Sequence, residues 1–203
     1  MGKLKGLAVM MVAVLASTAW GQVLMQKTEV TGGYTYGSLD QNGAGRLNSN
    51  GWNTGATTSI NRWLGVEGNV AGLSSSNSAS FTSGGTTFGG SASDKHYTFV
   101  FGPRFTFGHG RVNPFVHTLV GLDRETFKFS QASSSGTFSS NTTDNAFASA
   151  LGGGLEYGLT EHFGLITGSD YLMTRHGSAT QNNVRVQAGV VYRFGSGWEQ
   201  SKK

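Results

Sequence analysis

The stretch of residues 184–194, VRVQAGVVYRF, decides the fold because its side chains alternate between two kinds. Every second residue from Val184 to Phe194 is apolar or aromatic, whereas the intervening positions include Arg185, Gln187 and Arg193. Alternation with a period of two over a run of this length predicts a β-strand with one apolar face and one mostly polar face. Such a strand must bury its apolar face, either in a protein core or in a membrane.

The N-terminus has the parts of a secretory signal peptide. Two lysines precede the apolar run Leu7 to Ala16, which is too short to cross a bilayer as a helix, and small residues follow it. We expect cleavage before Gln22, so that residues 1–21 are a signal peptide and residues 22–203 form one domain. An uncleaved membrane anchor is the alternative.

The composition favours an exported β-protein. The chain has 32 glycines, 2 prolines and no cysteine, and only 13% of its residues are charged, so it folds without disulfides. Its 13 Phe, 6 Tyr and 4 Trp residues argue against a disordered chain. The net charge of +4 includes two signal-peptide lysines, so it gives no reason to expect a nucleic-acid partner.

Seven further segments show strand-like patterns, and together with residues 184–194 they predict eight strands. These segments are residues 27–37, 51–60, 64–73, 96–107, 112–129, 145–157 and 162–174. The phase of residues 112–129 is ambiguous, which predicts a β-bulge there. Tight turns are expected near residues 61, 108 and 159.

Polar segments between the other strands are predicted to be longer loops, at residues 38–50, 74–95, 130–144 and 175–183. Short turns that alternate with longer loops are typical of a transmembrane barrel with short periplasmic turns and long external loops. Aromatic residues near the strand ends predict two girdles. The predicted periplasmic girdle contains Trp63, Phe107, Tyr157, Phe163, Tyr192 and Phe194, and the external one contains Tyr36, Trp52, Tyr97, Phe147 and Tyr171.

The separation of charge between the two faces distinguishes a membrane barrel from a soluble one. The predicted outward positions carry essentially no charge, and a charge facing lipid at mid-depth would cost about 2–4 kcal/mol. Seven charged residues are predicted to face inward, where they form a polar interior: Glu29, Glu67, Arg104, Glu156, Asp170, Arg185 and Arg193. A soluble β-sandwich or lipocalin-like barrel is the alternative, but it would place these charges in a dry core.

The end of the final strand resembles the C-terminal assembly signal of bacterial outer-membrane barrels. The residues that carry this resemblance are Gln187, Gly189, Tyr192 and Phe194. It implies that the barrel assembly machinery of Gram-negative bacteria recognises the strand during biogenesis. Residues 195–203 extend beyond Phe194, which usually ends this signal.

Three internal segments also resemble the eight-stranded, porin-like outer-membrane barrels related to OmpX and to the OmpA transmembrane domain. They are NRWLG at residues 61–65, FGPRF at 101–105 and ALGGGL at 150–155. The resemblance implies an all-β, antiparallel, up-and-down transmembrane β-barrel of eight strands. It also implies a location in the cell outer membrane, in contact with lipid and lipopolysaccharide.

Ion pairs are expected inside the barrel, because an eight-stranded barrel is just wide enough for side chains to fill it and buried charges are normally paired. Asp170 and Arg185 are nearly equidistant from the tip of the last hairpin, which predicts a cross-strand pair. Glu67 with Arg104, and Glu29 with Arg193, are the other expected pairs. A structural role is the main interpretation, and an ion gate that opens a narrow path is the alternative.

No catalytic, cofactor or metal site is predicted. His176 and Ser178 in the last external loop, with His96 near another strand end, offer at most a candidate for lipid A modification. The histidines are scattered, and no metal-ligand spacing such as His-Glu-x-x-His occurs. The leading prediction is therefore a non-enzymatic outer-membrane protein with a structural or surface-interaction role. A narrow gated pore is the first alternative, and the sequence does not indicate an oligomeric state.

Overall fold

The computed structural model describes residues 27–40, 45–83, 86–108, 110–133, 136–176 and 179–195. In these residues eight antiparallel strands close into one barrel, in which each strand pairs with its neighbours in sequence and β1 pairs with β8. The strands are β1 (Lys27–Asp40), β2 (Arg46–Ser59), β3 (Leu64–Ser83), β4 (Thr86–Thr106), β5 (Val112–Ser133), β6 (Gly136–Gly158), β7 (Phe163–His176) and β8 (Ala179–Gly195). The predicted fold and number of strands are confirmed. The expected signal peptide, residues 1–21, lies outside the described residues.

The two ends of the barrel differ. The predicted tight turns follow β2, β4 and β6, and their backbone hydrogen bonds include Ile60 N to Leu64 O at 2.9 Å and Leu159 N to Phe163 O at 2.9 Å. Lys27 of β1 pairs with Gly195 of β8, so both described chain ends lie at this short-turn end. The opposite end, where β3 joins β4 and β5 joins β6, is named the hairpin end.

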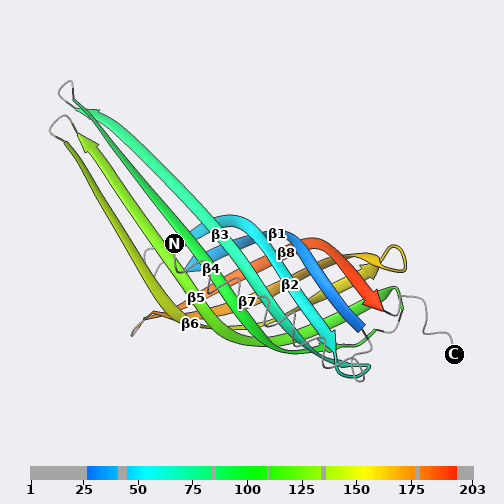
Figure 1. Ribbon diagram of the computed structural model, residues 1–203. Helices are drawn as coiled ribbons and strands as arrows, with labels where there is room; N and C mark the ends of the chain where they lie inside the picture. The colour runs from blue at the N-terminus through cyan, green and yellow to red at the C-terminus, as the bar shows by residue number, and fades with distance from the viewer. Residues whose placement is uncertain are drawn as a thin grey trace, which may run out of the picture.

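The prediction of loops at residues 74–95 and 130–144 was wrong. β3 and β4 stay paired up to Ser83 opposite Thr86, and β5 and β6 stay paired up to Ser133 opposite Gly136. β4 also pairs with β5 as far as Gly89 opposite Ala132, so the two hairpins form one four-stranded sheet. Figure 1 shows these hairpins running far beyond the rest of the barrel. Residues 38–40, 46–50, 175–176 and 179–183, predicted as loops, also belong to strands.

The predicted bulge in residues 112–129 is absent. The register between β5 and β6 runs without a shift from Val112 opposite Tyr157 to Ser133 opposite Gly136. The register with β4 is also constant on both sides of Pro103, a residue that has no backbone N–H to donate. The phase was ambiguous because β5 carries apolar side chains on both faces. Phe115 and Leu119 are buried, while Val116 and Val120 are exposed.

The outward face forms an apolar band that ends in aromatic rings. Exposed aliphatic side chains are spread around the barrel, including Val30, Val66, Val116, Val120, Leu151, Leu155, Leu165, Val186 and Val190. At the short-turn end Trp63 stacks on Phe105, with ring centroids 5.7 Å apart. Tyr97, Phe147 and Tyr171 are exposed towards the hairpin end. This arrangement matches the two predicted girdles.

Among the described residues, no helix has the length and the apolar character needed to cross a membrane.

Candidate functional site: a layered barrel interior

The interior nearest the short-turn end holds the first group of ion pairs. Glu29, at the start of β1, accepts a hydrogen bond from Arg193 of β8, with Nε to Oε1 at 2.7 Å. Lys27 Nζ lies 2.5 Å from the same carboxylate oxygen. The predicted pairing of Glu29 with Arg193 is therefore present. It ties the first strand to the last, at the seam where the barrel closes.

Arg104 of β4 is the centre of the next group and is 1% exposed. Its guanidinium donates to Glu156 of β6, and its Nη1 lies 3.6 Å from Glu67 Oε2. The guanidinium carbon also sits 3.7 Å from the centre of the Phe115 ring, which is a cation–π geometry. The pair predicted for Glu67 and Arg104 is present, but Glu156 is the closer partner of Arg104.

His117 of β5 connects the group around Arg104 to a third group, which is formed by Asp170 and Arg185. Its Nδ1 lies 2.9 Å from Glu67 Oε2, and its Nε2 lies 2.9 Å from Asp170 Oδ1. Asp170 also accepts from Arg185, with Nε to Oδ2 at 2.9 Å, as the sequence predicted. The network thus crosses the barrel from β3 to β8. His117 was not among the residues predicted from the sequence, because the alternation of residues 112–129 does not show which side chains face inward.

Gly152 makes room for this contact. A Cβ atom at position 152 would collide with Asp170 Oδ1 and would lie 2.9 Å from His117 Nε2. On the same strand, a Cβ at Gly154 would collide with Thr167 O and would lie 2.9 Å from the Phe115 ring. The run Gly152 to Gly154 belongs to the predicted strand 145–157 and to one of the segments that resemble the barrel family. In the structure, Gly152 and Gly154 give space to the interior network.

An apolar layer separates this network from the hairpin end. Val100, Leu119, Ala148, Ala150 and Leu172 form a cluster in which every member is at most 3% exposed. These residues come from β4, β5, β6 and β7, on the same strands that place Arg104, His117, Glu156 and Asp170 closer to the short-turn end. Apolar side chains offer no ligands to a hydrated ion, so this layer opposes passage along that side of the interior.

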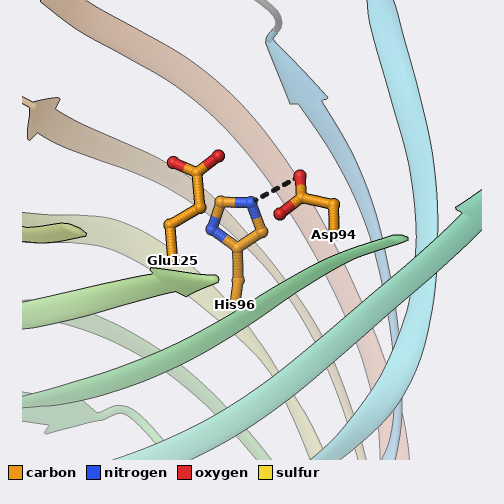
Figure 2. Close-up of side chains that lie close together, drawn as sticks. All are labelled: Asp94, His96 and Glu125. Atoms are coloured by element: carbon orange, nitrogen blue, oxygen red, sulfur yellow. Dashed lines mark hydrogen bonds and ion pairs between the residues drawn. The ribbon is translucent and has the colours of Figure 1, made fainter. Parts of the chain in front are cut away.

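A second polar cluster lies beyond the apolar layer, at the mouth of the barrel. His96 of β4 is 5% exposed, and its Nδ1 lies 3.0 Å from Asp123 Oδ2. Its Nε2 lies 3.1 Å from Asp94 Oδ2. Thr98 donates to the other Asp123 oxygen at 2.8 Å. Figure 2 shows the carboxyl group of Glu125 of β5 close to the ring of His96.

The charged outward neighbours of this cluster place it outside the membrane-spanning part of the strands. Lys95 and Arg124 are exposed on the outer face, and Arg124 is paired in register with Tyr97. The lipid-facing part of β4 therefore begins at Tyr97. Burial acts to lower the pKa of His96, but hydrogen bonds with Asp123 and Asp94 outweigh this effect and raise the pKa to about 10.

The residues predicted as an assembly signal all lie on β8. Gln187 is buried and accepts a hydrogen bond from Asn53 at 2.5 Å. Gly189 lies opposite Gly33 of β1, and a Cβ at either position would meet the backbone of the other strand. Tyr192 packs edge-on against Phe194, with ring centroids 4.7 Å apart. The structure thus places these residues at the closing seam and in the aromatic girdle.

The candidate residues for lipid A modification were His96, His176 and Ser178. Ser178 lies outside the described residues, and His176 is the last residue of β7. His96 instead belongs to the cluster at the barrel mouth, where its ring nitrogens contact carboxylates.

Comparison with known proteins agrees with the geometry. The sequence profile of the outer membrane protein beta-barrel domain matches residues 6–194, so the chain belongs to this family of outer-membrane barrels. No curated protein matches the sequence of the chain. The family indicates a location in the outer membrane, with short turns expected on the periplasmic side and hairpins outside.

Solved structures with the same fold come from several bacteria. Ail, the attachment invasion locus protein of Yersinia pestis, is 20% identical, with a TM-score of 0.61 over 84% of this chain and 99% of that chain. Neisserial surface protein A is 14% identical, with a TM-score of 0.57 over 82% of this chain and 97% of that chain. At these identities the likeness concerns the fold alone.

Proposed function

We propose that this chain is a non-enzymatic outer-membrane protein that contacts its surroundings through the extended ends of β3 to β6. These ends together form one sheet, named the external sheet. The observation that carries the proposal is the continued pairing of these strands beyond the aromatic girdle, to Ser83 opposite Thr86 and to Ser133 opposite Gly136. A regular sheet holds its side chains and backbone groups in fixed positions, which a flexible loop does not.

The edges of this sheet support a role in binding. In the described residues, β3 pairs with β2 only up to Ser74, and β6 pairs with β7 only up to Phe147. The segments beyond these points, residues 75–83 and 136–146, thus have one edge without a neighbouring strand. Unpaired strand edges present backbone donors and acceptors that can add a strand from a partner. Their Ser-, Thr- and Asn-rich composition keeps the edges soluble.

Basic side chains at the base of the sheet fit an anionic partner. Lys95, Arg124 and Lys128 are all exposed on the outer face of β4 and β5. Lys95 lies opposite Thr126, so it sits diagonally between Arg124 and Lys128. This position, just beyond the lipid-facing residues, is suited to the phosphates of lipopolysaccharide. A structure of Ail was solved in complex with the heparin analogue sucrose octasulfate, a polyanion.

A double truncation of the sheet tests the proposal. Ser76 pairs with Ser93, and Lys128 pairs with Asn141, so residues 77–92 and 129–140 can each be replaced by an Asn-Gly turn. Cells that display the full-length protein are expected to bind immobilised heparin more tightly than cells with the truncated protein, which keeps the cations Lys95, Arg124 and Lys128 but loses the backbone groups of the extended strands. Heat-modifiable gel migration checks that both barrels are folded. Equal binding by the two folded proteins would refute the role of the sheet.

Lipid A analysis tests the non-enzymatic part of the proposal. Lipid A from cells that express the wild-type protein is expected to have the same composition as lipid A from cells without it. A change in acylation or phosphorylation that His176→Ala abolishes would overturn this expectation and would favour a lipid A-modifying barrel.

A further inference from the structure

Three side chains at the mouth of the barrel converge from two strands. One ligand atom from each of Asp94, His96 and Glu125 lies within 4.8 Å of the other two. Asp94 and His96 stand two residues apart on β4, so they share its inward face, and Glu125 of β5 is paired in register with His96. Figure 2 shows the two carboxyl groups beside the ring of His96. Strand geometry thus assembles a set of ligands that no short sequence motif reveals.

The imidazole is held in the orientation that metal-binding histidines adopt. His96 Nδ1 lies 3.0 Å from Asp123 Oδ2, and Asp123 is fixed in turn by the hydroxyl of Thr98 at 2.8 Å. A histidine that binds a metal ion commonly donates its other ring N–H to a carboxylate in this way. His96 Nε2 is then the nitrogen that faces Asp94 and is available to an ion.

An unsatisfied oxygen gives independent evidence for a ligand. Asp94 is 5% exposed, and its Oδ2 contacts His96. Its Oδ1 is buried and accepts no hydrogen bond within the described part of the chain. A buried carboxylate oxygen without a partner is costly, and a cation beside it removes this cost.

We propose that Asp94, His96 and Glu125 bind a divalent first-row transition-metal ion, of which Zn²⁺ is the test case. One imidazole and two carboxylates form a mixed nitrogen and oxygen set, which suits such ions better than Ca²⁺ or Mg²⁺. Ligand atoms around a tetrahedral ion with bonds of 2.0–2.1 Å lie about 3.3 Å apart. The distance from His96 Nε2 to Asp94 Oδ2 is 3.1 Å, so these two ligands need little movement, and Glu125, within 4.8 Å of both, would move closer on binding.

The ion would displace a proton from His96 and would join two strands. In the absence of metal the imidazole bridges Asp94 and Asp123, so metal entry releases the proton on Nε2. Bound metal would then connect β4 to β5 through Glu125. This link lies at the base of the external sheet, where β4 and β5 leave the membrane.

Titration of the folded protein with Zn²⁺ tests the site. Untagged protein in detergent micelles is stripped with a chelator and titrated by calorimetry at mildly alkaline pH. One ion per chain is expected, and His96→Ala and Asp94→Asn should each weaken binding at least tenfold. Asp123→Asn, a positioning variant, should weaken it about 10–100-fold while the stoichiometry remains. In wild type, the NMR signal of His96 Nε2 should shift on binding, because this nitrogen becomes the ligand.

His162→Ala is the matched control, because His162 is exposed in the turn before β7, at the opposite end of the barrel. It should bind Zn²⁺ as wild type does. Heat-modifiable migration confirms that each variant is folded. The proposal is overturned if folded wild type binds no stoichiometric Zn²⁺, if His96→Ala binds as tightly as wild type, or if Ca²⁺ binds as tightly as Zn²⁺.

Discussion

Asp170 of β7 and Arg185 of β8 are directly paired in register, and the guanidinium Nη2 lies 2.5 Å from the carboxylate Oδ2. Asp170 also contacts His117 through its other oxygen. One carboxylate thus links the last hairpin to β5 across the interior. Both members of the pair are at most 2% exposed, so neither charge can be solvated by water if the other is removed.

Removal of the Asp170 charge is predicted to destabilise the barrel strongly. Asp170→Asn leaves Arg185 buried without a counter-charge, and such a change typically costs about 3–5 kcal/mol. The measurement is equilibrium urea unfolding in lipid vesicles, followed by tryptophan fluorescence. Glu161→Gln serves as the control, because Glu161 is exposed in the turn before β7. A similar free energy of unfolding for both variants would show that the pair contributes little.

A methyl group at position 152 is predicted to disturb the same network. Gly152→Ala would place a Cβ against Asp170 Oδ1 and 2.6 Å from Ser169 O, so the strand must shift. Overpacking of this kind costs about 1–3 kcal/mol. Gly68→Ala is the matched control, because a Cβ at Gly68 meets no atom within 4 Å. Urea unfolding of the two variants should separate them, and equal stabilities would argue against a packing role for Gly152.

These contacts show which parts of the interior the sequence could predict. Asp170 and Arg185 were paired correctly because both strands alternate cleanly and the two residues are nearly equidistant from the tip of the hairpin that joins them. His117 and Phe115 were missed because Leu119 and other apolar residues face inward on β5, which hides the alternation. Apolar side chains on β5 must face inward there to fill the apolar layer next to Arg104. They remove the alternation of apolar and polar residues by which the inward face of a strand is recognised.

The external sheet was predicted as loops for a related reason. Periodic hydrophobicity reports a strand only where one face is apolar, and these extensions have water on both sides. Residues 74–83 are mostly Ser, Ala and Asn, with no alternation between apolar and polar residues. Their pairing is determined by register that continues from the barrel. The cluster of Asp94, His96 and Glu125 was missed because Asp94 fell in the predicted loop 74–95, and because the phase of residues 112–129, which contain Glu125, was ambiguous.

The interior is predicted to block ion flow. Arg104 fills the space between Glu156, Glu67 and Phe115, and the apolar layer adjoins it. Planar-bilayer recordings of wild type should therefore stay at background conductance. Arg104→Ala removes the largest buried side chain of this region and is the variant most able to open a path. Discrete channel openings in wild type, reduced or altered by the substitution, would favour a gated pore.

Charge reversal at the base of the external sheet is predicted to weaken contact with lipopolysaccharide. The combined variant Lys95→Glu, Arg124→Glu and Lys128→Glu replaces three exposed cations with anions. Co-purifying lipopolysaccharide, quantified after mild detergent extraction, should fall several-fold. The remaining binding should be less sensitive to salt, because fewer ionic contacts are left. Arg62→Glu, in the turn between β2 and β3, should retain wild-type levels, and a loss of the same size there would point to a general charge effect.

The aromatic end of β8 is predicted to govern assembly more than final stability. Tyr192 packs edge-on against Phe163 of β7, with ring centroids 4.9 Å apart, and against Phe194 at 4.7 Å. Phe194 is half exposed in the girdle, where its ring meets the membrane interface, so Phe194→Ser should cost about as much stability as the same change at another girdle position. If the residue is part of an assembly signal, the variant should accumulate unfolded in cells, as pulse-chase with heat-modifiable migration would show. The same variant, refolded in vesicles, should lose no more stability than Phe107→Ser. Phe107→Ser, at a girdle position outside β8 that is 63% exposed against 50% for Phe194, should assemble normally, because a general loss of girdle contacts would affect both variants.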